Sequence, residues 1–178
     1  MPESINATAI SYNRHVSAGA SGVVIGDTRV FSPIPTSTEG FFFAVVDLST
    51  LEVVAQAAPV SNSSVPPEIA PYANKEGYFL FFITQLQSTR NLPQGDLYSF
   101  LMNSGAGAAL ENVEQIVEQI GTGFVLNYAY VLAGSLDSGD LPGFEVYSLD
   151  SNAILPMQFV PYDMDGKTMY APSRHSTP

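Results

Sequence analysis

The chain contains no cysteine. Disulfides, thiolate metal sites and cysteine nucleophiles are therefore excluded. It also has few basic residues, six Lys and Arg against seventeen Asp and Glu, which gives a formal net charge of −11. Nucleic-acid binding begins with neutralisation of phosphates by clustered Lys and Arg, and no such cluster occurs. We therefore expect no nucleic-acid partner, and anionic membrane surfaces are disfavoured for the same reason.

The chain also lacks long apolar runs and is poor in charge. No run approaches the roughly 20 apolar residues of a membrane-spanning helix, so membrane insertion is not expected. The first residues, MPESINATAISYN, show no basic segment followed by an apolar one, which predicts that they are not a signal peptide. Charged residues make up 13% of the chain, about half of the usual share. Such a surface is covered by neutral polar side chains or, in part, by a neighbouring subunit.

Two short apolar runs that open with glycine are the strongest structural signals. They are Gly40–Leu48 (GFFFAVVDL) and Gly77–Thr84 (GYFLFFIT), both rich in aromatic and β-branched residues. Runs of this length predict strands buried on both faces rather than helices. We expect two neighbouring central strands with the rest of the chain packed on them. With 178 residues, the chain can form one domain whose core needs neither disulfide nor metal.

Shorter patterns predict the remaining elements. Further strands are expected from short apolar or alternating segments at 23–25, 29–31, 52–57, 124–134 and 144–149. Apolar residues at helical spacing predict helices at 96–102 and 110–120.

The expected domain organisation has a folded centre and two arms. Residues 1–17 are predicted to be an extended N-terminal arm, and 18–155 the folded domain. Residues 156–178, which contain four prolines and no periodicity, are predicted to be a C-terminal tail. The predicted fold class is α/β (α+β-like), as a single compact domain of packed β-sheet with a few short helices.

Three apolar segments occur in an order shared with a known domain family. Ala44–Val53 (AVVDLSTLEV) has the form NVVVIDPxTGxV, Leu80–Thr84 has the form VLIAV, and Tyr128–Ser135 (YAYVLAGS) has the form WAFIGVKG. Over roughly residues 20–150, the chain thereby resembles the interleukin-like EMT-inducer (PANDER-type) domains. It differs from them in lacking cysteine, in having Leu51 in place of the turn glycine, and in having Tyr128 where tryptophan is usual.

The resemblance implies a compact α/β fold with packed sheets and short helices, and a role that is not enzymatic. Related modules occur as carbohydrate-binding stem domains and as parts of larger extracellular proteins. The animal members are secreted and disulfide-bonded. Because this chain has no cysteine, a secreted signalling role is not carried over to it.

No set of residues indicates catalysis or metal binding. The only histidines, His15 and His175, lie in the two predicted arms, so neither a Ser–His–Asp triad nor a histidine metal site is expected. The segment Asp163–Gly166 (DMDG) has glycine at position 4, whereas a calcium loop has it at position 6, and a simple turn is predicted. We expect no cofactor, no metal and no enzymatic activity.

Acidic residues leave one enzymatic alternative. A glycoside hydrolase needs two carboxyl groups in a cleft, and the chain offers seventeen candidates. Asp47 stands at the end of a predicted strand, where a turn residue that caps the local backbone is the favoured interpretation. For Asp137, Asp140 and Glu145, a solvated turn is favoured over a divalent-ion site.

Candidate contact residues follow from position and side-chain type. Arg90 and Asn91 come after a central strand, where α/β folds place ligand contacts. Tyr98 and Tyr147 offer an aromatic ring with a polar end, which suits glycan or protein contacts. Four aromatic residues in or beside the arms are the candidate assembly contacts: Tyr12, Phe159, Tyr162 and Tyr170.

Three functions remain open at this point. The first is a non-enzymatic structural or interaction module in a larger assembly, such as a virion or phage-tail-like particle, with other protein subunits as partners in a homo- or hetero-oligomer. Such a particle component would be made in the cytoplasm without a signal peptide. The alternative is a carbohydrate-binding module that recognises a glycan. The second alternative is an acidic enzyme of the glycoside hydrolase type.

Overall fold

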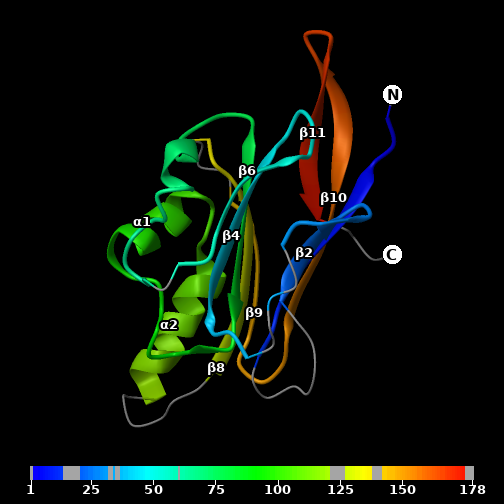
Figure 1. Cartoon of the computed structure of the whole chain (residues 1–178). Helices are drawn as coiled ribbons and strands as arrows, with labels where there is room; N and C mark the ends of the chain where they lie inside the picture. Colours follow the sequence, from blue (N-terminus) through cyan, green and yellow to red (C-terminus); the bar gives the residue numbers. More distant parts are fainter. Residues whose placement is uncertain are drawn as a thin grey trace.

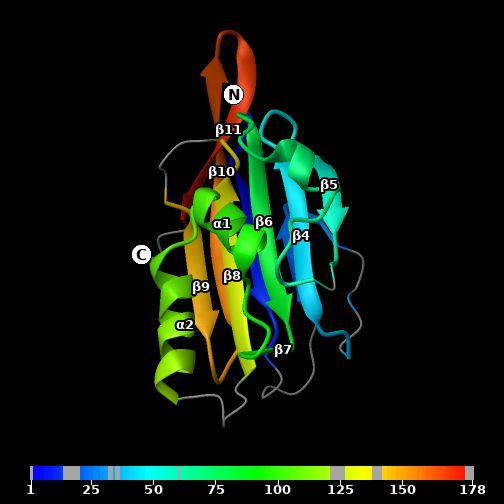
Figure 2. The same ribbon diagram turned by 90° about the vertical axis from the view of Figure 1, so that its left-hand side faces the viewer.

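The computed structural model describes residues 2–13, 21–31, 34, 37–59, 61–120, 127–137 and 142–174. These residues form two antiparallel β-sheets and two α-helices, which are stacked as sheet A, sheet B and a helical layer (Figures 1 and 2). The fold is β-sandwich-like, and the predicted α/β class was wrong. Strands buried on both faces are typical of parallel sheets between helices, but here a second sheet covers one face and every strand pairing is antiparallel.

Sheet A has the strand order β11-β10-β1-β2-β3. Its strands are β1 (Ile5–Ser11), β2 (Gly22–Ile25), β3 (Thr28–Arg29), β10 (Ala153–Met164) and β11 (Lys167–Arg174). Sheet B has the order β5-β4-β6-β8, and β7 and β9 also pair with β8. Its strands are β4 (Gly40–Asp47), β5 (Val53–Ala57), β6 (Tyr78–Gln85), β7 (Gln87–Ser88), β8 (Asn127–Ser135) and β9 (Phe144–Ser148). The helices are α1 (Gly95–Asn103), α2 (Ala108–Ile120) and a 3-10 turn, η1 (Ala70–Tyr72).

The two predicted central strands are neighbours in the middle of sheet B. β4 and β6 pair from Gly40 with Gln85 to Asp47 with Tyr78, and both strands are buried on both faces. Phe42 faces the core between the sheets, and its neighbours in β4, Phe41 and Phe43, face the core under the helices. This part of the prediction is confirmed.

The helical layer also lies where apolar spacing predicted it. Leu97 and Leu101 of α1, and Leu110 and Val113 of α2, are buried against sheet B. The strands predicted at 23–25 and 29–31 appear as the paired strands β2 and β3, although β3 ends at Arg29, and the predicted strand at 52–57 appears as β5. The beginning of the predicted strand at 124–134 lies outside the described residues, and the rest forms β8.

Both predicted arms belong largely to sheet A, which corrects the expected organisation. β1 pairs with β10 from Ile5 with Phe159 to Ser11 with Ala153, so the two ends of the chain form neighbouring strands. β10 crosses the predicted boundary at residue 155 and continues to Met164, where it turns back into β11. The resulting hairpin projects beyond the other strands (Figure 1).

Prolines misled the prediction because they occupy positions that cost no ladder hydrogen bond. Pro161 lies opposite Tyr170, whose N–H points away from β10 and donates to the carbonyl of Leu48 (2.8 Å). Residues in an antiparallel pair alternate between bonded and non-bonded positions. Pro172, two residues beyond Tyr170, therefore also occupies a non-bonded position, which is where proline is tolerated in a strand.

The segment read as a tail turn is a tight hairpin turn. Asp165 and Gly166 both have positive φ angles, 53° and 78°, as in the two-residue type I′ turn that Asp-Gly favours. They join Met164 to Lys167, which are paired in the ladder. An Asp-Gly pair between two strands was thus a usable signal, and the interpretation of 156–178 as a tail ignored it.

One end of the core between the sheets is polar. Ile83 pairs with Val131 and Gln87 pairs with Tyr128, so three residues, 84–86, face only two of β8, and the ladder is bulged there. The freed N–H of Tyr130 donates to the hydroxyl oxygens of Thr84 (2.9 Å) and, from sheet A, Ser11 (3.1 Å). Both hydroxyl residues are fully buried, so they join the two sheets at a fixed register.

The edge strands of both sheets are blocked against further strands. β3 has two residues, and the ladder between β4 and β5 is irregular beside Val54, whose carbonyl accepts from the Tyr72 hydroxyl (3.4 Å). α2 packs against β9, and β11 has lost edge donors through Pro172 and the bond from Tyr170. Short, bulged or covered edges of this kind prevent sheet extension by another chain.

If β10 is a core strand, truncating a side chain on its buried face should lower the free energy of unfolding. Phe159→Ala should lower the free energy of unfolding by about 3–5 kcal/mol. The buried ring packs against Phe79 and Phe81, with distances between ring centroids of 5.6 and 6.4 Å. Ile154→Ala, in the same strand but 52% exposed, should cost less than about 1 kcal/mol. Urea unfolding measures both values. Equal costs for the two variants would mean that β10 does not close the core.

Candidate functional site

The outer face of sheet A is the side that points away from sheet B. It consists of the strand residues that alternate with the buried ones. The ladder registers place on it Asn6, Thr8, Ile10, Gly22, Val24, Arg29, Ile154, Pro156, Gln158, Val160, Tyr162, Met164, Lys167, Met169, Ala171 and Ser173. We call this set the outer face.

The outer face gathers exposed apolar side chains. Seven large hydrophobic residues are exposed among the described residues, and five of them lie on this face: Val24, Ile154, Val160, Tyr162 and Met164. Their exposed fractions run from 36% to 55%. Single exposed apolar residues are normal, but a contiguous group of them marks a contact surface.

Charge is distributed unevenly around the molecule. The residues of the outer face include two basic side chains, Arg29 and Lys167, and no acidic one. The chain as a whole carries a net charge of −11. The helical layer on the opposite side is acidic, with Glu111 and Glu118 exposed on α2. The outer face is therefore a largely apolar surface without negative charge on a strongly acidic protein.

β10 explains why this face differs from an ordinary solvated sheet. A solvated antiparallel sheet alternates apolar and polar residues. In β10 the buried row, Leu155, Met157 and Phe159, alternates with Ile154, Pro156, Gln158 and Val160. The strand is thus apolar on both faces, as β4 and β6 are, but the structure covers one face alone.

The predicted assembly contacts are scattered by the fold. Tyr162 lies on the outer face and is 43% exposed. Phe159 is fully buried between the sheets, so it offers no surface to a partner and that assignment is corrected. Tyr170 packs against the same core, and Tyr12 continues β1 as a bridge to Gln85.

Most of the exposed apolar residues of the outer face were not predicted as contact residues from the sequence. Ile154, Val160 and Met164 stand in the segment interpreted as domain end and tail. A period of two is not visible there because both faces are apolar. The usable signal was the Asp-Gly turn, which fixes the hairpin and hence the alternation on either side of it.

The predicted ligand residues do not form one surface. Arg90 is exposed. The side-chain amide of Asn91 donates to the side-chain oxygen of Gln87 (2.6 Å), and the backbone carbonyl of Asn91 accepts from the Tyr128 hydroxyl (3.2 Å). Tyr98 and Tyr147 are half-buried beside the core under the helices. Asn91 and the two tyrosines therefore serve the packing of that layer.

Glu145 is engaged in the structure as a helix cap. Its Oε2 atom accepts from the buried Tyr130 hydroxyl (2.6 Å) and from the N–H of Leu110 (3.3 Å) in the first turn of α2. A carboxylate at that position satisfies an orphan N–H and the helix dipole. Burial, and then the charge of Glu145, holds the pKa of Tyr130 well above its usual value, so the phenol stays a neutral donor.

The other predicted acidic sites are structural or lie outside the described residues. Asp47 caps its own turn, with its Oδ1 atom accepting from the N–H (2.7 Å) and hydroxyl (2.6 Å) of Ser49. Asp163 accepts from the N–H of Gly166 (3.1 Å) within the hairpin turn. Asp140, His15 and His175 fall outside the described residues.

Neither a metal centre nor a membrane helix emerges from the described part of the chain. Within it, no three His, Cys, Asp or Glu side chains come together as metal ligands. Its helices are also too short or too polar to span a bilayer.

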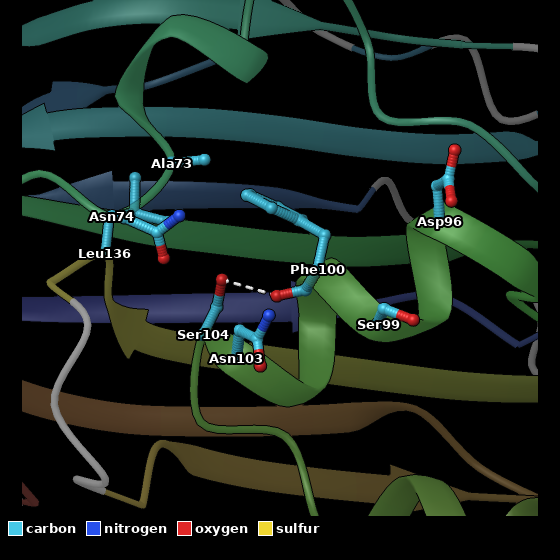
Figure 3. Close-up of a pocket in the computed structure, with 8 residues that line it drawn as sticks. All are labelled: Ala73, Asn74, Asp96, Ser99, Phe100, Asn103, Ser104 and Leu136. Atoms are coloured by element: carbon cyan, nitrogen blue, oxygen red, sulfur yellow. Dashed lines mark hydrogen bonds between the residues drawn. The ribbon is translucent and has the colours of Figure 1, made fainter.

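A shallow pocket of about 200 Å³ lies between α1 and the loop that follows η1 (Figure 3). Asp96, Ser99 and Asn103 line it from one side of α1, and Asn74 faces them from the loop. The pocket offers hydrogen-bonding groups to a small polar molecule. All four residues are exposed to solvent, so nothing in their placement selects one class of ligand.

The bond between Tyr130 and Glu145 should hold α2 on the sheet. Tyr130→Phe should lower the free energy of unfolding by about 1.5–3 kcal/mol, as expected for a hydrogen bond to a charged group. Tyr147→Phe is the matched control, because its hydroxyl has no hydrogen-bond partner in the described structure and its residue pairs with Tyr130 across the ladder. Thermal and urea unfolding compare the two, and equal losses would contradict the cap.

Glu114 should make stability depend on pH. Burial raises the pKa of Glu114, a hydrogen bond with Tyr98 lowers it, and the nearby Glu118 and Glu111 raise it again. With a raised folded-state pKa, the carboxyl favours folding below its unfolded pKa, and that contribution is lost as the pH rises through the folded pKa.

Glu114→Gln should therefore increase the free energy of unfolding at pH 7, and the increase should shrink as the pH falls towards about 4. Urea unfolding across this range measures the difference. Glu68→Gln, at an exposed carboxyl before η1, removes the same charge and is the matched control. A profile for Glu114→Gln parallel to that of the unsubstituted chain would refute the assignment.

Comparison with known proteins adds no relative from which a role could be transferred. No protein-family model matches the chain. No curated protein matches its sequence either. The resemblance to the interleukin-like EMT-inducer domains therefore stays a prediction, and the assignment of a function rests on the outer face of sheet A.

Proposed function

We propose that the chain is a non-enzymatic interaction module that joins protein subunits through the outer face of sheet A. The supporting observation is the exposed apolar row of β10 on a face without acidic residues. We further propose that the module works in a larger assembly, such as a virion or a phage-tail-like particle. Low surface charge and a projecting hairpin fit a protein that is partly covered by neighbours (Figure 1).

The blocked edges support contact through a face. Proteins that assemble by strand addition leave a free edge whose backbone groups pair with the partner. Here the edge strands are short, irregular, covered or deprived of donors, as at Val54 and Pro172. The large exposed apolar area lies on a face, so side-chain packing is the interaction that this surface offers.

The two alternatives draw less support from the arrangement of side chains. A glycan site built from the predicted residues would need Asn91, Tyr98 and Tyr147 to be available, and these are used in internal packing. A hydrolase would need two unengaged carboxyl groups across a cleft. Glu145 instead caps α2.

A matched pair of lysine substitutions tests the proposal in the native setting. Val160 lies on the outer face and Val54 on β5, and they are 36% and 38% exposed. In extracts of the native source, the tagged chain should sediment far above its own mass of 19.0 kDa. Val160→Lys should shift most of it to the free fraction, because a buried contact does not tolerate an unpaired charge, whereas Val54→Lys should not.

The outcome is read by gradient sedimentation and immunoblotting. Equal behaviour of the two lysine variants would contradict a role for the outer face. An unsubstituted chain that sediments as a free 19.0 kDa protein would overturn the proposed assembly role itself.

A further inference from the structure

We infer that the outer face of sheet A binds a second copy of this chain, in a two-fold, face-to-face dimer with Gln158 on the axis. This inference rests on the proposed function, which gives the face a protein partner but does not name it. Two properties of the face favour a second copy, its charge and the order of side chains along β10, and its dimensions are compatible with one.

Charge limits which surfaces two copies can bring together. Each copy carries a net charge of −11, and like charges brought into contact oppose association. The outer face has no acidic residue among those described, so two such faces can meet without opposing carboxylates. Its two basic residues, Arg29 on β3 and Lys167 beside the hairpin turn, lie apart at the margins of the sheet.

The dimensions of the face are compatible with a specific interface. β10 has 12 residues, which at about 3.3 Å per residue is ~40 Å, and the five strands span roughly 24 Å at about 4.8 Å each. The enclosing area of roughly 950 Å² is an upper bound, and a standard interface buries ~800 Å² on each partner. Face-to-face packing of sheets is also the contact that sheet A already makes with sheet B.

The outer row of β10 is nearly symmetric about Gln158. On one side of it stand Pro156 and Ile154, and on the other side Val160 and Tyr162. A two-fold axis that passes through Gln158 across the strands places Ile154 of one copy against Tyr162 of the other, and Pro156 against Val160. Apolar residues then meet apolar residues on both sides of Gln158.

Gln158 is the polar exception in that row and fits the axis for a chemical reason. It is half-buried in the single chain, and a side-chain amide carries both donors and an acceptor. On a two-fold axis, the amides of the two copies can therefore bond to each other. The projecting hairpins point in opposite directions in this arrangement, so the hairpin of each copy covers the Ile154 end of its partner.

A head-to-tail stack is the competing arrangement. In it, Arg29 and Lys167 would meet the acidic helical layer of the next copy, with Glu111 and Glu118. Such heterologous contacts continue from copy to copy, whereas a two-fold contact stops at two. Ion pairs would also weaken with salt, whereas apolar packing between two acidic chains should strengthen as salt screens their repulsion.

Sedimentation equilibrium of the pure full-length chain tests the inference. The mass should double and then stay constant as concentration rises to the order of 100 µM, and more NaCl should tighten the dimer. Val160→Lys should weaken dimerisation on the order of 100-fold or more, because both copies bury the charge. Val54→Lys should leave the dimer unchanged.

A second matched pair of substitutions tests where the two-fold axis lies. Gln158→Glu places two carboxylates against each other and should abolish the dimer at pH 7, with recovery below about pH 4, where the carboxyls are protonated. Thr8→Asp, at the residue paired with Pro156 on β1, puts its charges off the axis and should weaken the dimer much less. Circular dichroism of each variant confirms that the monomer is folded.

Each alternative outcome is decisive. Mass that keeps growing with concentration and falls with salt would overturn the two-fold dimer in favour of the head-to-tail stack. Equal effects of Gln158→Glu and Thr8→Asp would overturn the axis. A pure chain that stays monomeric would overturn self-association, while the sedimentation of Val160→Lys in native extracts would still decide whether the face binds a different protein.

Discussion

The central strands of sheet B are apolar on both faces, and the rest of the structure depends on covering them. Neither side of β4, β6 or β8 can be left in water without exposing aromatic and aliphatic side chains. Sheet A covers one side and the two helices cover the other, so the order of the layers follows from one property of three strands. Buried hydroxyls of Ser11 and Thr84 then fix how the covering sheet sits.

β10 also has apolar side chains on both faces, and its uncovered face is the surface that a partner can bind. To keep both apolar faces from water, such a strand needs a packing partner on each side, and within the part of the chain that the structure describes only sheet B packs on it. Elsewhere the described part of the molecule leaves few such surfaces, because the edges of its sheets are blocked and just two of the seven exposed large hydrophobic residues, Val54 and Ile120, lie off the outer face. The proposed function therefore rests on this uncovered apolar face, because the tyrosines and carboxyl groups with identifiable contacts, such as Tyr130 and Glu145, are engaged within the fold.

Sequence patterns predicted the central strands and both helices because each of those patterns is local. The runs at Gly40 and Tyr78 and the helical spacing at Leu110 needed no knowledge of what covers them. What covers them is not local, and so the α/β class was wrong. The hairpin at Asp165 was missed because Pro161 and Pro172 were read as breakers, although proline is harmless where no ladder bond is made. Of the outer face, Tyr162 was predicted and Ile154, Val160 and Met164 were not.

The pairing of β1 with β10 places a constraint on the moment at which the protein can fold. Ile5 is paired with Phe159, and more than 150 positions separate them in the sequence. When the strands of sheet B and the helices have been synthesised, β10 of sheet A has not. The aromatic face of β4 and β6 therefore stays uncovered during synthesis. Closing so long a loop is slow. The nascent chain thus exposes the aromatic face of β4 and β6 until β10 has been synthesised, which makes it a suitable substrate for chaperones that bind apolar β-strands.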